Sequence, residues 1–112
     1  MKQEDRVILR FSIAVSIRCN AIDNPLPESP TPEQAAAYIR GVLEVLFEKT
    51  GLDIDVQPLV YPACGKFPLI IRLADECECL FWFYPYMEPG TLAVHLEESL
   101  NDLFCGTVRI PA

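Results

Sequence analysis

The chain has 112 residues, of which 51% are apolar and 22% charged, and its formal net charge is −7 at pH 7. This length and composition predict one globular domain over residues 1–112, with enough apolar surface to form its own core. The acidic balance argues against direct binding to nucleic acid or to anionic membranes, because both depend on a surplus of lysine and arginine.

The first element expected is a long strand in the segment RVILRFSIAVSIRCN, residues 6–20. Its apolar residues recur at every second position: Val7, Leu9, Phe11, Ile13, Val15, Ile17 and Cys19. Mostly polar residues stand between them. A period of two over so many residues predicts a strand with one face toward the core.

A proline-rich loop and a helix are expected next. The segment NPLPESPTP, residues 24–32, carries four prolines in nine residues and excludes both helix and ladder. Thr31 is placed to cap a helix, Pro32 suits the first helical position, and Gln34 completes a capping box. The apolar stripe that follows predicts an amphipathic helix that ends near Gly51.

Three further strands are expected in the second half of the chain. LDIDVQPLVY, residues 52–61, alternates, and Pro58 removes a ladder donor, which places this strand at an edge or ends it there. FPLIIRL, residues 67–73, and CECLFWFY, residues 77–84, predict two strands joined by a tight turn.

A second helix and a last strand complete the predicted fold. TLAVHLEESLNDLF, residues 91–104, has Leu92, Leu96 and Leu100 on one face, and TVRI, residues 107–110, can form a short strand. The class predicted is α+β: an antiparallel sheet of four to five strands with two helices on one face, in ferredoxin-like β-α-β-β-(β)-α-β order.

The strand at residues 77–84 has apolar residues on both faces, which raises the question of what covers the second face. The residues predicted by parity to share that open face as a binding surface are Arg10, Arg18, Arg72, Leu80, Trp82 and Tyr84, with Arg6 and Arg109 beside them. Exposed aromatics of this size mark interfaces. A sheet-to-sheet homodimer is the cover expected first. The alternatives are a foreign protein, a small ligand or nucleic acid, or the loop at 23–32 folded over the patch.

A second surface is expected on the helices. The acidic helical face predicted consists of Glu33, Glu44, Glu48, Glu97, Glu98 and Asp102. Such a face would fit a basic groove on a partner. The function predicted is therefore protein–protein interaction, for example as an inhibitor or adaptor of a larger nucleic-acid-handling machine, in the manner of phage or mobile-element anti-defence factors. The alternative is a small-ligand-binding domain or an enzyme with its site at the arginine and aromatic sheet face or at a dimer seam.

Motifs for catalysis, cofactors or metals give weaker signals. Cys77 and Cys79 lie two apart and in phase with the predicted core, which favours buried thiols over a zinc half-site. Cys64, near Lys66, is the candidate for a reactive thiol. There is no phosphate loop or nucleophile elbow in the sequence, so we expect no cofactor and favour a non-enzymatic role. Five cysteines without a signal peptide favour a cytoplasmic location.

Overall fold

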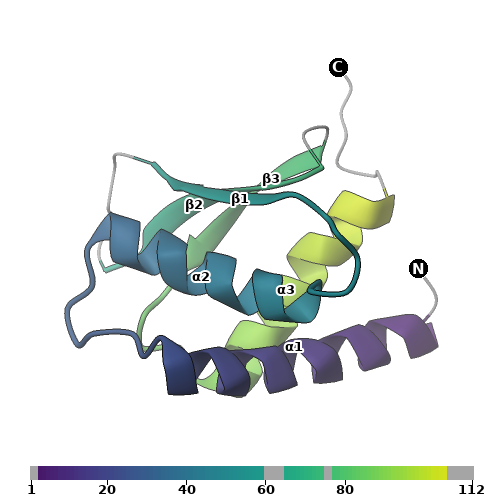
Figure 1. The fold of residues 1–112 in the computed structure, drawn as a ribbon, viewed down its shortest axis with the longest axis horizontal. Coiled ribbons are helices and arrows are strands. Elements are labelled where there is room, and N and C mark those ends of the chain that lie inside the picture. Colours follow the sequence, from purple (N-terminus) through teal and green to yellow (C-terminus); the bar gives the residue numbers. More distant parts are fainter. Residues whose placement is uncertain (1–2, 60–64, 75–76, 106–112) are drawn as a thin grey trace.

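The computed structural model describes residues 3–59, 65–74 and 77–105, and within them the chain forms three helices and one three-stranded sheet. In chain order the elements are α1 (Gln3–Asp23), α2 (Pro32–Leu46), β1 (Ile54–Pro58), β2 (Phe67–Leu73), β3 (Cys77–Phe83) and α3 (Pro89–Cys105). The arrangement has three layers (Figure 1). α2 and α3 pack on the sheet, and α1 packs across them on the side away from it.

The sheet is antiparallel in the order β1-β2-β3, and its three strands fall in the three segments of the second half of the chain that were predicted as strands. Val56 pairs with Ile71, and Ile71 with Cys79, so one face of all three strands is in register. β1 is an edge strand that ends at Pro58, which confirms the expectation for that proline. The face with Phe81 and Phe83, 3% and 1% exposed, lies toward the helices.

The prediction of a strand over residues 6–20 is wrong, since this segment belongs to the helix α1. Leu9, Ile13 and Ile17, four residues apart, face the core. Val7, Phe11 and Val15 are also four apart, and they face solvent. Two helical stripes of period four, offset by two residues, together produce an alternation of period two.

The predicted fold class is wrong for the same reason. Without a strand at residues 6–20, the sheet has three strands in the described residues instead of four to five, and three helices replace two. The element order is α-α-β-β-β-α, so the ferredoxin-like order does not apply. The predicted last strand, TVRI, lies outside the described residues.

The other two helices agree with the sequence. The Thr31 hydroxyl accepts a hydrogen bond from the Gln34 backbone N–H, and the Gln34 side chain accepts one from the Thr31 N–H, which confirms the capping box. The predicted end of this helix near Gly51 is wrong, since α2 ends at Leu46 and Gly51, with a φ of 69°, belongs to the turn that follows. The predicted apolar stripe of α3 is buried: Leu92, Leu96, Leu100 and Leu103.

Candidate interaction surfaces

The outer face of the sheet carries a row of large apolar side chains along β3. Leu80, Trp82 and Tyr84 are 47%, 43% and 37% exposed, and they alternate with the buried Phe81 and Phe83. The predicted parity of this strand is therefore confirmed. Because these side chains stand on a hydrogen-bonded sheet whose other face is core, they are held in place without a partner.

Polar residues border this apolar row across the strands. Asp55, Arg72 and Glu78 are in register on the outer face, and Arg72 Nη2 lies 3.1 Å from Glu78 Oε2. At the other end, Lys66 Nζ lies 5.1 Å from the centre of the Tyr84 ring, a cation–π contact. The outer face thus has an apolar centre and a charged rim, the composition typical of protein interfaces.

A shallow hollow adjoins the apolar row at Tyr84. It has a volume of about 270 Å³ and is lined by Tyr84, Tyr86, Met87, Thr91 and His95. This is at or below the lower end of the size range of small-molecule sites. A hollow of this size suits one anchoring side chain of a protein partner.

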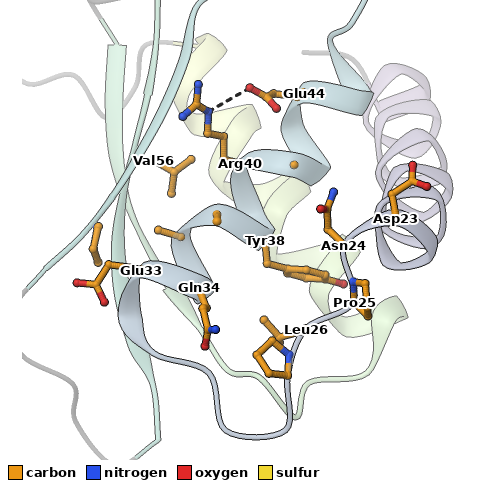
Figure 2. A pocket seen from close by; sticks show the side chains of 15 residues that line it. Asp23, Asn24, Pro25, Leu26, Glu33, Gln34, Tyr38, Arg40, Glu44 and Val56 are labelled. Carbon is orange, nitrogen blue, oxygen red and sulfur yellow. Dashed lines mark hydrogen bonds and ion pairs between the residues drawn. The ribbon is translucent and has the colours of Figure 1, made fainter.

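The loop at residues 23–32 does not cover the sheet face, so that alternative is wrong. Leu26 packs against the core, and Pro25 and Pro27 line a larger hollow of about 830 Å³ between this loop, α2 and β1 (Figure 2). The Tyr86 hydroxyl donates a hydrogen bond to the Glu28 carbonyl at 3.4 Å. The loop therefore lies along the helices, which leaves Trp82 and its neighbours open.

This larger hollow has an acidic rim. Asp23, Glu33 and Glu44 line it, and the guanidinium of Arg40 is ion-paired with Glu44 at 3.0 Å (Figure 2). Tyr38 lies within it, and burial raises the pKa of that phenol. The surplus of carboxylates disfavours anionic ligands here.

Three of the arginines predicted for the sheet face, Arg6, Arg10 and Arg18, lie elsewhere, because they belong to α1. Arg18 is exposed on α1, and Arg10 donates to the carboxylate of Glu97 on α3 at 3.0 Å. Arg6 donates to the same carboxylate at 2.6 Å. Of the predicted sheet-face residues, the structure brings together Arg72, Leu80, Trp82 and Tyr84. Arg109 and Cys64 lie outside the described residues.

The structural role of Glu97 was not predicted from the sequence, which placed this residue on an exposed acidic face. Its side chain is 0% exposed and accepts one hydrogen bond from Arg6 at Oε2 and two from Arg10 at Oε1. The pKa of Arg6 is raised by its hydrogen bond to Glu97. The one signal in the sequence was the spacing of Arg6 and Arg10, which puts both on the same face of a helix as the buried stripe.

The predicted acidic face is consequently divided. Glu97 faces the core, Glu33 and Glu44 line the larger hollow, and Glu98 and Asp102 lie near Arg6, whose pKa both carboxylates help to raise. Glu48 is exposed just beyond the end of α2. Glu97 is therefore not part of an exposed face, and the other five carboxylates lie on α2, just beyond its end and on α3.

Cys79 is a half-buried thiol on the helix-facing side of β3. Burial, with a contribution from the nearby Asp102 carboxylate, raises the pKa of Cys79 to about 11. At about pH 8 we expect iodoacetamide to alkylate Cys79 at least about tenfold more slowly in the folded protein than in concentrated urea, because little thiolate is present. Peptide mass mapping measures both rates, and equal rates would contradict this.

The raised pKa of Cys79 also predicts a pH dependence of stability. Between a pH of about 9, where the unfolded thiol titrates, and about 11, the unfolded chain binds fewer protons than the folded one. The free energy of unfolding should therefore fall as the pH rises through this window. Urea titrations at several pH values measure it, and Cys79→Ala, which removes the thiol, should show a smaller fall.

Comparisons of the chain with protein-family models, with curated proteins and with solved structures gave no match. Among the described residues, no helix combines the length and apolar character needed to cross a bilayer. In the same part of the chain, no three His, Cys, Asp or Glu side chains are grouped as a metal site would require.

Proposed function

We propose that this protein is an interaction domain that binds a partner protein through the outer face of its sheet. The observation that carries the proposal is the exposure of Leu80 and Trp82 on β3 and of Tyr84 directly after it, at 37–47%. Trp and Tyr are the residue types that contribute most to protein interfaces. The adjoining hollow at Tyr84, Tyr86 and Met87 offers a place for an anchoring side chain.

The charges support a protein partner over a small ligand. A ligand site needs several convergent polar groups, and among the described residues Arg72 is the predicted arginine that lies on this face, where it is paired with Glu78. The net charge of −7 favours a partner with a basic surface, such as a protein that handles nucleic acid. The proposal includes the role predicted from the sequence, which is that of an inhibitor or adaptor in the cytoplasm.

The proposal predicts that truncating the apolar row abolishes partner binding. Captures from cells that produce the protein would compare the wild type with Trp82→Ala and Leu80→Ala. Ile22→Ala is the matched control, because Ile22 is 82% exposed but lies near the end of α1. A partner of the sheet face should be retained by the wild type and the control, and its affinity should fall about tenfold or more in the two sheet variants.

Trp82 supplies a direct readout for the purified complex, since it is the one tryptophan of the chain. Its fluorescence should show water contact in the free protein and shift to shorter wavelength when the partner is added. A captured partner that binds Trp82→Ala and Leu80→Ala as tightly as the wild type would refute the proposal. Loss of a wild-type dimer in Trp82→Glu would identify the partner as a second copy, the homodimer that the sequence favours.

A further inference from the structure

α1 presents a second apolar surface, on the side of the molecule away from the sheet. The large side chains exposed there are Val7 at 52%, Ile8 at 63%, Phe11 at 70%, Val15 at 43% and Ile22 at 82%. A helix that covers a core normally has a polar outer face. α1 is apolar on both sides, and exposed apolar surface of this extent marks an interaction site.

The spacing of residues along this surface is symmetric. Glu4, Val7, Phe11, Val15 and Arg18 follow one another at intervals of three, four, four and three residues, which keeps all five on one side of a helix. The order reads the same in both directions from Phe11, except that the charges at the two ends are opposite. All five side chains are exposed.

This symmetry is what an antiparallel pair of identical helices requires. If two copies of α1 pack about a two-fold axis at Phe11, each Val7 lies opposite the other copy's Val15 and the two Phe11 rings meet. Each Glu4 then lies opposite the other copy's Arg18, so one ion pair forms between the copies at each end of the two helices. Neither Glu4 nor Arg18 makes an ion pair within the described part of its own chain.

We infer that the protein forms a two-fold symmetric homodimer through antiparallel packing of α1, centred on Phe11. The stripe from Glu4 to Arg18 spans about 21 Å at the rise of an α-helix, and helices pack at about 8–10 Å, which brings facing side chains into contact. A lipid surface is the less suitable occupant, because Arg18 is the one basic residue of the stripe and membrane-surface helices need several.

This dimer is independent of the proposed sheet-face binding but gives it a consequence. α1 lies in the layer farthest from the sheet (Figure 1). A dimer through α1 therefore leaves the outer sheet face of each copy open. Each dimer would then bind two partner molecules, or two sites on one partner, and gain avidity.

Charge reversal tests the inference at the predicted ion pairs. Glu4→Arg places two arginines opposite each other at both ends of the pair, and Arg18→Glu does the same with two glutamates. Each variant alone should dimerise at least about tenfold more weakly than the wild type by sedimentation equilibrium. An equimolar mixture of the two should form a heterodimer with near wild-type affinity, because each end then pairs Arg with Glu.

Two further variants make the test specific to α1. Phe11→Asp should abolish the dimer, since it buries two like charges at the axis, whereas Trp82→Glu should leave it unchanged. A wild-type protein that stays monomeric, reversals without effect, a mixture that forms no heterodimer, or a dimer lost in Trp82→Glu would each overturn the inference. So would binding of the wild type, but not of Phe11→Asp, to phosphatidylglycerol vesicles without dimerisation. If these experiments show no dimer through α1, the proposed binding of a partner protein by the sheet face still stands.

Discussion

Replacing both Arg6 and Arg10 by methionine is expected to lower the melting temperature by more than about 10 °C, and this is the largest effect that we predict. Both guanidiniums bind the carboxylate of Glu97, whose side chain is 0% exposed. Without them the charge of Glu97 stays buried between α1 and α3 with no compensating partner. Removing one side of a buried ion pair is strongly destabilising for this reason.

Glu97→Gln should lower the melting temperature less than the double arginine substitution does. In Glu97→Gln the two arginines lose their charged partner, but their side chains are 33% and 43% exposed and can be hydrated. The triple variant Arg6→Met, Arg10→Met, Glu97→Leu should recover most of the loss, because it replaces the whole ionic cluster by apolar packing. Calorimetry on the three variants measures the order. A double variant as stable as Glu97→Gln would show that Glu97 is not buried as described.

Gly41→Ala is expected to destabilise the protein by about 1–3 kcal/mol, although alanine normally stabilises a helix. A methyl group at Gly41 would lie 2.4 Å from Oδ1 of Asn20, which is a clash. Asn20 is 2% exposed, donates to the Tyr38 carbonyl at 3.0 Å and accepts from Asn24 at 3.2 Å. Its side chain therefore cannot move without losing its hydrogen bond to α2 and the one that it accepts from Asn24.

The sign of this effect should reverse when Asn20 is shortened. In an Asn20→Ala background the clash is gone, and Gly41→Ala should be neutral or stabilise by up to about 1 kcal/mol through helix propensity. Gly90→Ala is the control, because nothing lies within 4 Å of the added methyl group. Urea unfolding of the four members of this cycle gives the coupling directly. Additive effects of the two substitutions would contradict the close approach of α1 and α2.

Local signals in the sequence were sufficient for α2, α3 and the strands. The capping box at Thr31 and the leucine stripe of α3 depend on neighbours within one or two turns, and both are present in the structure. The alternation of β3 placed Trp82 outward and Phe83 inward, because successive side chains of a strand point to opposite faces. These features needed no knowledge of distant residues.

The role of Glu97 could not be found in the same way. Its partners Arg6 and Arg10 are 91 and 87 residues away in sequence, and a glutamate next to Glu98 on a helix has the pattern of a solvated face. Burial of that carboxylate depends on how α1 crosses α3. The predicted acidic face included Glu97 because helix periodicity alone does not tell which side of α3 a second layer of helix will cover.

The sequence by itself determined the cap of α2, the parity of β3 and the exposed aromatic face at Trp82, but not the number of strands and helices. The tertiary structure alone decided that residues 6–20 form a helix, because Leu9, Ile13 and Ile17 bury one stripe against α2 and α3 while Val7, Phe11 and Val15 remain outside. An alternating pattern is compatible with one strand face or with two opposite helix faces. Packing against the rest of the chain selects between them, and here it left the second stripe free for another molecule.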